Sequence, residues 1–500
     1  MCAVVPAAWL VLAGITQQAM GRYSPFDPDY YYLLSSLDLA ESKSLGLFQH
    51  PGTPAAILGA AVMTGEQLLT GSGEGVQADV LNHPERYLAL LRIWSAILIA
   101  LGLAAVGVVT LRATRSPWLA LLLQLSVFMS PVVVNDSVGR FKPEPVLLFA
   151  CLLFVAVMVA AVRSPNPSSR WFTIAFGLAC GLGLATKFTF ASVTIVPFLL
   201  ARGWKQKAEV IAWTLLAFFL FTLPIADRYD DLLMWTQTNL THTGLYGSGE
   251  PGFVETDSYL AGVAALARGN ALFGAVLIIA LAAIALVATK DRQSQDFRAL
   301  CALTVSLIVG FALVTKHGSF ADANRYLFCS YCLLGLTLWL SVTTYTRLSF
   351  ATPAVRYLVP AAVLAVAASV ITVMPPSLSA HINRLHAAKA SQLDRDSKLA
   401  VLEEGTWKNY VRIYDLGTQR TPLNGLFQAS YYSTSHLEAL GRTFPTTYFC
   451  DSGNCTADNW KTKHIVGLDH QAITPTELIA RHGAHIVMIY GHTPTIEAVK

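Results

Sequence analysis

Long apolar runs alternate with short polar segments along most of this chain. Because about 20 consecutive apolar residues span a bilayer as a helix, the pattern predicts a mostly α-helical, polytopic membrane protein. About eleven membrane spans are expected, at roughly 3–20, 86–111, 116–134, 143–162, 171–185, 187–201, 209–226, 270–289, 299–316, 325–346 and 354–375. The short pair at 171–185 and 187–201 is also compatible with one broken or re-entrant element.

Basic residues between the apolar runs predict the orientation of the chain. With the N-terminus inside, every expected inner loop carries at least two Lys or Arg residues, such as Arg112 and Arg115, in agreement with the positive-inside rule. The segments that then fall outside are 21–85, 135–142, 227–269, 317–324 and everything after residue 375. The loop 227–269 is expected either to close over a substrate or to form a disordered connection.

The pattern changes after residue 375. Residues 376–500 are polar, with a short helix expected at Thr476–Arg481 and strand-like runs at Tyr410–Leu416, Thr446–Cys450, His464–Leu468 and His485–Tyr490. We therefore expect a transmembrane domain over 1–375 and a small extracytoplasmic α/β domain over 376–500. In that domain Cys450 and Cys455 flank a short polar loop, and they are candidates for a disulfide if the loop faces an oxidising compartment.

Composition strengthens the membrane assignment. The chain is 54% hydrophobic and only 13% charged, whereas soluble domains carry about 25% charged residues. Its net charge of +4 is spread without a Lys/Arg-rich run, so nothing indicates a nucleic-acid partner. The first apolar run lacks a charged start and an obvious cleavage site, which favours a retained helix over a removed signal.

Several cations fall on the expected outer side, where a positive-inside protein carries few. Ionisable groups at membrane depth are costly and mark functional sites by default. Lys and Arg bind phosphate well, so as a set they predict a site for the phosphate of a lipid carrier, although each alone is compatible with interfacial anchoring. These residues are Arg140, Lys142, Lys187, Lys316, His317 and Arg325.

Three carboxylates are candidates for catalysis. Asp27 and Asp29 in FDPDYYY suit a helix start, with Asp27 as N-cap, Pro28 at the first helical position and Asp29 in the first turn. A carboxylate placed there can also take a proton from an acceptor hydroxyl. Glu144 opens the apolar run PVLLFACLLFVAV, where it would favour the helix dipole or bind sugar hydroxyls or a divalent metal.

Aromatic residues and a histidine complete the first outer loop. His50 precedes Pro51, so an extended conformation is expected, with the ring at the phosphate or at the interface. Tyr30, Tyr31 and Tyr32 are most simply an interfacial aromatic belt, and Tyr31 is the candidate to stack on a sugar.

Five motifs, spread over residues 26–328, together resemble the GT-C glycosyltransferase superfamily. They are FDPDYYY, HPGTP, GRFKPEPVLLF, GLGLATKF and ANRYLF, and they are similar to the branch of protein O-mannosyltransferases and lipid A aminoarabinose transferases. The resemblance implies an inverting transfer of a sugar from a polyprenyl-phosphate donor to a hydroxyl of a lipid, glycan or protein acceptor. We expect a bacterial inner-membrane protein whose site faces the periplasm or exterior.

The resemblance also implies roles for individual residues. The general base maps onto Asp27, with Asp29 as the alternative, because relatives often have Asp-Glu where this chain has Asp-Pro-Asp. Glu144 is the second acid. The basic residues expected to stabilise the leaving phosphate are His50, Arg140, Lys187 and Arg325. Since members of the superfamily differ in metal use, a divalent metal at Asp27 and Glu144 stays open.

Two other classes of protein compete with this interpretation. A transporter or lipid flippase would use the outer charges to bind a carried solute, but paired Gly/Pro-broken spans in two matching halves, the usual repeat signature, are not evident. A non-catalytic membrane subunit with a receptor-like outer domain would leave the clustered outer charges unexplained.

Overall fold

A computed structural model describes most of the first 346 residues and shorter parts of the remainder. The described residues are 2–20, 28–70, 75–244, 247–288, 293–316, 323–346, 361, 379–380, 382–383, 400–404, 407–414, 436–443, 447–450, 465–466, 472–482 and 487–490. Asp27, His317, Cys455 and nearly all of the expected span 354–375 lie outside this set.

The chain forms two compact units. Unit 1 contains Met1–Gly14, Phe48–Pro54 and Ser95–Ser379, and unit 2 contains Ile15–Leu47, Ala55–Trp94 and Ala380–Lys500. The helices α1 (Val4–Met20), α3 (Thr53–Thr70) and α5 (Pro84–Thr114) contribute residues to both units. The proposed division at residue 375 stays a prediction.

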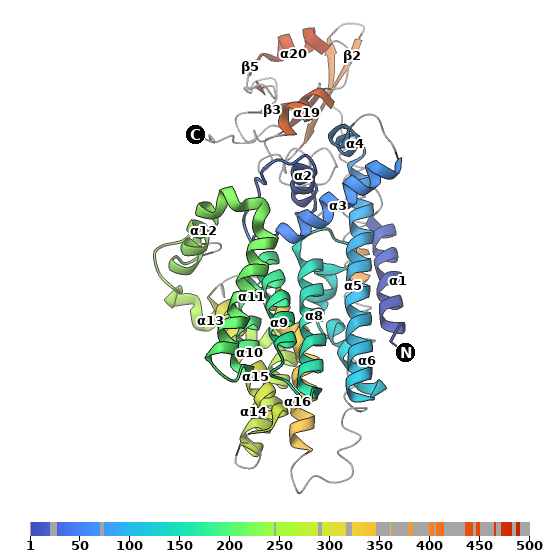
Figure 1. The fold of residues 1–500 in the computed structure, drawn as a ribbon. Helices are drawn as coiled ribbons and strands as arrows, with labels where there is room; N and C mark the ends of the chain where they lie inside the picture. The colour runs from blue at the N-terminus through green and yellow to red at the C-terminus, as the bar shows by residue number, and fades with distance from the viewer. Residues whose placement is uncertain are drawn as a thin grey trace. The chain divides into compact units, whose positions relative to one another are not determined.

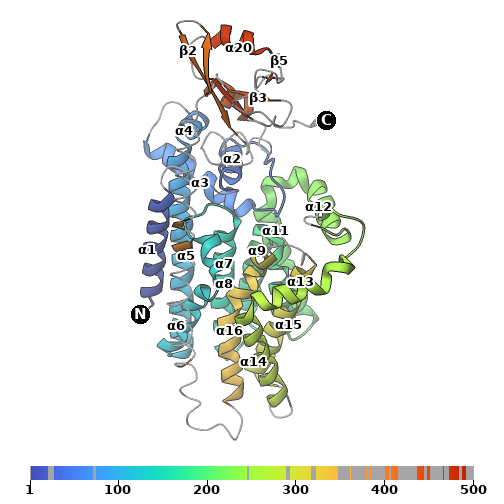
Figure 2. The ribbon, with the colours of Figure 1, turned by 180° about the vertical axis from the view of Figure 1, so that it is seen from behind.

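Unit 1 is helical in its described part (Figures 1 and 2). After the second half of α5, its elements are α6 (Pro117–Leu125), η1 (Ser126–Met129), α7 (Pro131–Ser137), α8 (Pro143–Arg163), α9 (Arg170–Thr186), η2 (Phe188–Phe190), α10 (Ala191–Leu200), α11 (Trp204–Thr222), η3 (Leu223–Arg228), α12 (Tyr229–Thr241), α13 (Thr256–Gly269), α14 (Ala271–Val287), α15 (Gln295–Thr315), η5 (Ala323–Leu327) and α16 (Phe328–Tyr345).

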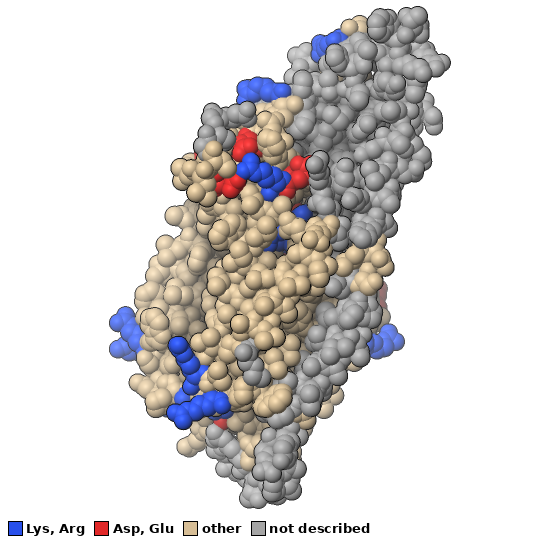
Figure 3. Space-filling model, turned by 90° about the vertical axis from the view of Figure 1, so that its right-hand side faces the viewer, with Lys and Arg blue, Asp and Glu red and all other residues tan. Residues whose placement is uncertain are grey.

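Five helices of the described chain are long and apolar enough to cross a membrane, or up to seven if each bent pair is one span. Three shorter apolar helices overlap expected spans: Val4–Gln18, Arg170–Thr186 and Phe188–Leu200. The structure therefore agrees with a polytopic membrane protein, while the number eleven stays a prediction. Figure 3 shows a broad uncharged area on one face, as expected for helices that contact lipid.

The core of unit 1 centres on α8 and α16, whose apolar side chains are buried nearly all round. By contrast, α11 exposes Ile211, Leu215 and Leu220. A helix buried on every side needs no polar face, which explains why α8 reads as a continuous apolar run. An exposed apolar face, as on α11, is the signature of a helix that contacts lipid.

Helices α9 and α11 lie side by side (Figure 1), and two glycines on α9 allow their close approach. A Cβ atom added at Gly177 would lie 2.3 Å from Cβ of Trp213, and one at Gly181 would lie 2.4 Å from Cβ of Ala217. The four-residue spacing places both glycines on one helix face, an arrangement that lets membrane helices pack backbone to backbone.

Unit 2 combines helices of the first loop with a sheet near the C-terminus. Its helices are α2 (Asp29–Ala40), most of α3, α4 (Val76–Asn82), the start of α5, α19 (Leu437–Thr443) and α20 (Pro475–His482). Its strands are β1 (Ala400–Glu404), β2 (Trp407–Tyr414), β3 (Thr447–Cys450), β4 (Ile465–Val466), β5 (Ala472–Ile473) and β6 (Val487–Tyr490).

The sheet has the order β1-β2-β6-β3-β4-β5. The central strand β6 is parallel to β2 and β3, and the outer pairs are antiparallel. The four expected strand-like runs coincide with β2, β3, β4 and β6, whereas β1 and β5 were not expected. A separate C-terminal α/β domain stays a prediction.

Candidate functional site

A buried cluster of charges lies at the start of α8. Nζ of Lys187 donates to Oε1 of Glu144 at 2.6 Å, and Nζ of Lys142 lies 3.6 Å from Oε2 of the same carboxylate. Lys142 also donates to Oδ1 of Asp136 at 2.7 Å. Lys142, Glu144 and Lys187 are each less than 10% exposed. The structure thus brings together three of the residues that the sequence singled out.

The end of α9 places Lys187 in this cluster. The helix stops at Thr186, and Lys187 is extended (φ −161°, ψ 133°) while its N–H still donates to the carbonyl of Gly183. A Cβ at Gly183 would lie 2.4 Å from the ring of Phe190, so glycine lets the η2 turn fold back tightly. The segment 171–201 therefore contains two helices that are separated at Lys187, which agrees both with two short spans and with one broken element.

Arg325 and Tyr326 join the cluster from η5. Nζ of Lys187 lies 5.6 Å from the centre of the Tyr326 ring, and the Arg325 guanidinium carbon lies 5.3 Å from it. Arg325 also donates to the Tyr326 hydroxyl at 3.4 Å. An aromatic ring within about 6 Å of a cation attracts it through a cation–π interaction. Arg140 is 4% exposed, in the segment between α7 and α8.

A cavity of about 170 Å³ adjoins this cluster, because Tyr326 and the residues that follow Lys187 line it. Its aromatic lining is His50, Phe188, Trp235 and Tyr326, and Asn239 and Lys316 are among its polar groups. Mostly apolar walls with a few placed polar groups are typical of small-molecule sites. Aromatic faces beside amide and ammonium groups suit a sugar that carries a phosphate.

His50 contradicts its predicted conformation. Instead of being extended, it has a φ of +61°, and Gly52 two residues later has a φ of +68°. The left-handed region is unfavourable for a residue with a Cβ and persists where surrounding structure holds it. Here the His50 ring packs edge-on against Trp235 with centroids 5.0 Å apart. A tertiary contact has therefore outweighed the local preference imposed by Pro51.

The expected outer loop 227–269 contains the helices α12 and α13, not a disordered connection. Trp235 and Asn239 stand four residues apart on α12 and both line the cavity. Nζ of Lys316 donates to the backbone carbonyl of Asn239. Asn239 was not among the predicted site residues, and its helical spacing from Trp235 is the signal that would have found it.

In unit 2, Asp29 is completely buried in the first turn of α2, and Nη2 of Arg92 donates to its Oδ2 at 3.0 Å. The carbonyl of Pro28 accepts the first helical hydrogen bond, from Tyr32. Pro28 is thus the N-cap, and the prediction that Asp27 is the cap is wrong by one residue. Arg92 was not predicted, although an arginine inside an apolar run is itself a signal.

The tyrosines that follow Asp29 are not a simple interfacial belt. Tyr30 is completely buried, Tyr32 is 4% exposed and Tyr31 is half-buried. Burial raises the pKa of the Tyr30 phenol well above its usual range. Two of the three rings are therefore core residues, because nine of the twelve residues of α2 are buried and the helix is covered on nearly every side.

Unit 2 also contains a buried histidine that the sequence did not single out. His436 is fully buried, with Nε2 2.9 Å from Oδ1 of Asp38 and Nδ1 2.9 Å from the side-chain nitrogen of Gln77. Gln77 in turn donates to Glu41 at 3.3 Å. These contacts join α2 and α4 to the start of α19, so the C-terminal residue belongs structurally with the first loop.

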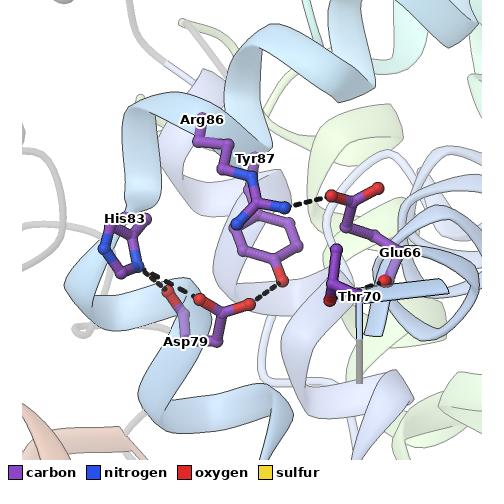
Figure 4. Close-up of polar contacts among 6 residues, drawn as sticks. All are labelled: Glu66, Thr70, Asp79, His83, Arg86 and Tyr87. Carbon is purple, nitrogen blue, oxygen red and sulfur yellow. Dashed lines mark hydrogen bonds and ion pairs between the residues drawn. The ribbon is translucent and has the colours of Figure 1, made fainter. Parts of the chain in front are cut away.

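A second polar cluster of unit 2 connects α3, α4 and α5 (Figure 4). The hydroxyl of Tyr87 donates to Oδ2 of Asp79 at 2.5 Å, and Nδ1 of His83 lies 3.1 Å from Oδ1. Arg86 donates to Glu66. The Tyr87–Asp79 contact joins α5 to α4 and the Arg86–Glu66 contact joins α5 to α3, so we interpret this cluster as one that holds the three helices together.

The remaining candidates can be placed only in part. Within the described residues there is no group of three or more His, Cys, Asp or Glu side chains arranged to hold a metal ion. Asp27 and Cys455 lie outside those residues, so the metal site at Asp27 and Glu144 and the Cys450–Cys455 disulfide stay predictions.

Comparison with known proteins gives one match, to a family model. No curated protein and no solved structure matches the chain. Residues 83–316 match the model of glycosyltransferase family 87. This range includes Arg140, Lys142, Glu144 and Lys187, the cluster at the start of α8. The match covers slightly less than half of the chain and, together with the apolar helices, supports a membrane glycosyltransferase.

Proposed function

We propose that this protein transfers a sugar from a polyprenyl-phosphate donor to an acceptor hydroxyl on the outer side of the membrane. The observation that carries the proposal is the cavity of about 170 Å³ beside the buried Lys187–Glu144 pair. The cavity combines aromatic walls with cations at one site, and a sugar phosphate needs both.

The cations supply the chemistry of the leaving group. Asp136 and Glu144 carry two negative charges, which Lys142 and Lys187 balance. Arg325 and Lys187 are both near the Tyr326 ring, and Lys316 is in the cavity wall, so two further cations are at this site. Fixed charges aimed at a departing phosphate stabilise the transition state without reorganisation.

This arrangement suggests a specific task for Glu144. Both of its oxygens face lysines, so its carboxylate holds the Lys187 ammonium in position beside Tyr326. In this proposal Glu144 is a positioning residue, and Lys187 contacts the donor phosphate. An unpaired lysine at this depth would be strongly disfavoured, which explains the need for the carboxylate.

We propose that the sugar binds against the wall of this cavity. His50 and Trp235 present aromatic surface, and Asn239 presents an amide. A water needs roughly 10–15 Å³ measured in this way, so the cavity has room for a molecule on the order of ten waters in size. That is adequate for one sugar ring.

The general base is assigned to Asp27, as the resemblance to the GT-C superfamily implies. Asp29 is buried and paired with Arg92, which supports a structural role for Asp29 and leaves the role of base to Asp27. A carboxylate held by a buried guanidinium is a weak base, because protonation would leave the guanidinium uncompensated. Asp29 thus holds the start of α2.

The test is sugar transfer by purified protein from a panel of polyprenyl-phosphate sugars. Asp27→Asn is expected to abolish turnover while donor binding and melting temperature stay unchanged. Asp257→Asn, at an exposed position on α13, is the matched control and should be fully active. Full activity of Asp27→Asn would remove the proposed base. No transfer from any donor, together with solute flux in vesicles, would favour a transporter instead.

A further inference from the structure

A second cavity lies at the opposite ends of the same helices. It is about 40 Å³ in volume and is lined by Ala161 near the end of α8 and Gln295 at the start of α15. Glu144 is in the first turn of α8 and Lys316 follows the end of α15. A helix of 21 residues, the length of α8, is about 30 Å long. This cavity is therefore separate from the proposed sugar site.

Two arginines border this cavity, the exposed Arg202 and the half-buried Arg298. Arg202 and Arg298 both line it, and no acidic residue does so in the described part of the chain. Nη2 of Arg298 donates to the carbonyl of Leu200 at 3.1 Å, which fixes its direction. Nearby, Arg163 has its own counterion, 2.7 Å away in Asp296. Like charges beside one cavity repel each other, and a bound anion would relieve that repulsion.

A buried hydroxyl provides an independent indication of a ligand. Thr173 on α9 lines the cavity and is 1% exposed. Its Oγ1 has no hydrogen-bond partner among the described residues. A buried hydroxyl without a partner is unfavourable, and an oxygen of a bound anion would satisfy it. Two arginines and a hydroxyl are the groups that proteins use to hold phosphate.

Aromatic residues place the cavity at the level of lipid headgroups. Trp171 at the start of α9 and Trp204 at the start of α11 are 69% and 80% exposed. Nζ of Lys207 lies 4.9 Å from the Trp204 ring. Exposed tryptophans beside basic residues mark a membrane–water interface. Farther along α9, Leu178 is also exposed and offers apolar surface to acyl chains.

We propose that Arg202, Arg298 and Thr173 form a binding site for the phosphate group of an anionic membrane phospholipid. Gln206 and Gln295, which also line the cavity, supply further donors to the phosphate oxygens. The site lies away from Lys187 and does not depend on the transfer reaction. Basic pockets between membrane helices are a known way to hold anionic headgroups.

Native mass spectrometry of the purified full-length protein tests this site. Phosphatidylglycerol, phosphatidylcholine or inorganic phosphate is added to the delipidated protein in three separate arms. We expect preferential retention of phosphatidylglycerol. Replacing both arginines, as Arg202→Gln/Arg298→Gln, should weaken that retention by about a hundredfold, because each charge-assisted contact contributes about tenfold. Thr173→Val should weaken it by about tenfold.

The control removes two charges from the same end of the helices. Arg170 and Lys205 are exposed and do not line the cavity, so Arg170→Gln/Lys205→Gln should retain phosphatidylglycerol as the wild type does. Equal loss in both double variants would overturn the proposal, as would unchanged retention in Arg202→Gln/Arg298→Gln. Displacement of the lipid by millimolar inorganic phosphate would assign the site to free anion. A melting curve for each variant confirms that it is folded.

Discussion

Oε1 of Glu144 accepts a hydrogen bond from Nζ of Lys187 at 2.6 Å, although the two residues are 43 positions apart, Glu144 in the first turn of α8 and Lys187 just past the end of α9. Both side chains are buried. The pair thus ties the first turn of α8 to the break after α9, and it fixes a cation beside the cavity.

Breaking this pair from one side is expected to be strongly destabilising. Glu144→Gln should lower the free energy of unfolding by about 3–5 kcal/mol, because it leaves the buried Lys187 ammonium without its carboxylate. Lys187→Met should lower it by less, because Lys142 still lies 3.6 Å from the Glu144 carboxylate. The double variant should lose less than the sum, and both single variants should be inactive. Thermal melts and transfer assays measure the two effects.

The two single variants and the double variant form a double-mutant cycle, and its control is an ion pair on the surface. Arg228 and Asp231 lie 2.5 Å apart, with more than a third of each side chain exposed, so Asp231→Asn should change stability by about 0–1 kcal/mol. Additive losses in the Glu144 and Lys187 cycle would show that the pair is not coupled.

A second double variant separates the structural role of Asp29 from catalysis. Asp29→Asn leaves Arg92 buried without its counterion and should destabilise the protein by about 3–5 kcal/mol. Asp29→Asn/Arg92→Met removes the stranded charge and should recover much of that stability. We expect sugar transfer by this double variant. A stable but inactive double variant would assign the base to Asp29.

Trp235 is expected to determine donor affinity. Trp235→Ala removes an aromatic wall of the cavity and its contact with His50, so KM for the donor should rise by about tenfold. Trp235→Phe should retain most of the affinity. Trp204→Ala, at an exposed position outside the cavity, should leave KM unchanged. Steady-state kinetics decide the question, and an unaltered KM in Trp235→Ala would exclude the wall from the sugar site.

Donor binding is expected to depend on pH through the charge of Lys316. Lys316 follows the last residue of α15 and is buried, and this burial lowers the pKa of its ammonium below the usual lysine range. The positive charge is therefore present at neutral pH and is lost as pH rises through that lowered pKa, before an ordinary lysine titrates at about 10.4. Affinity for the anionic donor should fall over this alkaline range in the wild type. Lys316→Arg, whose guanidinium stays charged, should bind with little change, and an identical fall in that variant would contradict the assignment.

Packing between α9 and α11 should depend on glycine at position 181. Gly181→Ala places a Cβ 2.4 Å from Cβ of Ala217 and 2.6 Å from the carbonyl oxygen of Thr214, so we expect a loss of about 1–3 kcal/mol. Gly274→Ala on α14 is the matched control. No atom lies within 4 Å of the added Cβ there, so stability should be unchanged or slightly higher. Equal melting temperatures for the two variants would contradict the close packing.

Local pattern was sufficient to locate the long apolar helices, but it did not reveal the helices α12 and α13 or the contacts that the first loop makes. The apolar runs around α5, α8, α15 and α16 were visible in the sequence because each is long and nearly free of charge. Arg92 and His436 were overlooked as partners because Asp29 and Asp38 find them across the fold, 63 and 398 positions away. Sequence spacing carries no information about such contacts.

Predictions that rested on local conformation alone failed where tertiary contacts were stronger. The rule for residues before proline assigned His50 to the extended region, whereas packing on Trp235 holds it at positive φ. Tyr30 was expected at an interface because tyrosine is common there, whereas it is completely buried. In both cases the packing of the folded chain decides the surroundings of the residue, which its neighbours in sequence do not encode.

The sequence by itself determined that the protein belongs in a membrane, because runs of apolar residues leave no other stable environment. It also marked Lys142, Glu144 and Lys187, because ionisable residues beside apolar runs are costly unless they pair or bind. Only the tertiary structure decided that these three form one buried cluster beside a cavity, and that Trp235 and Asn239 complete its wall. Distances between side chains depend on how helices pack, and helix packing follows from the shapes of many side chains together.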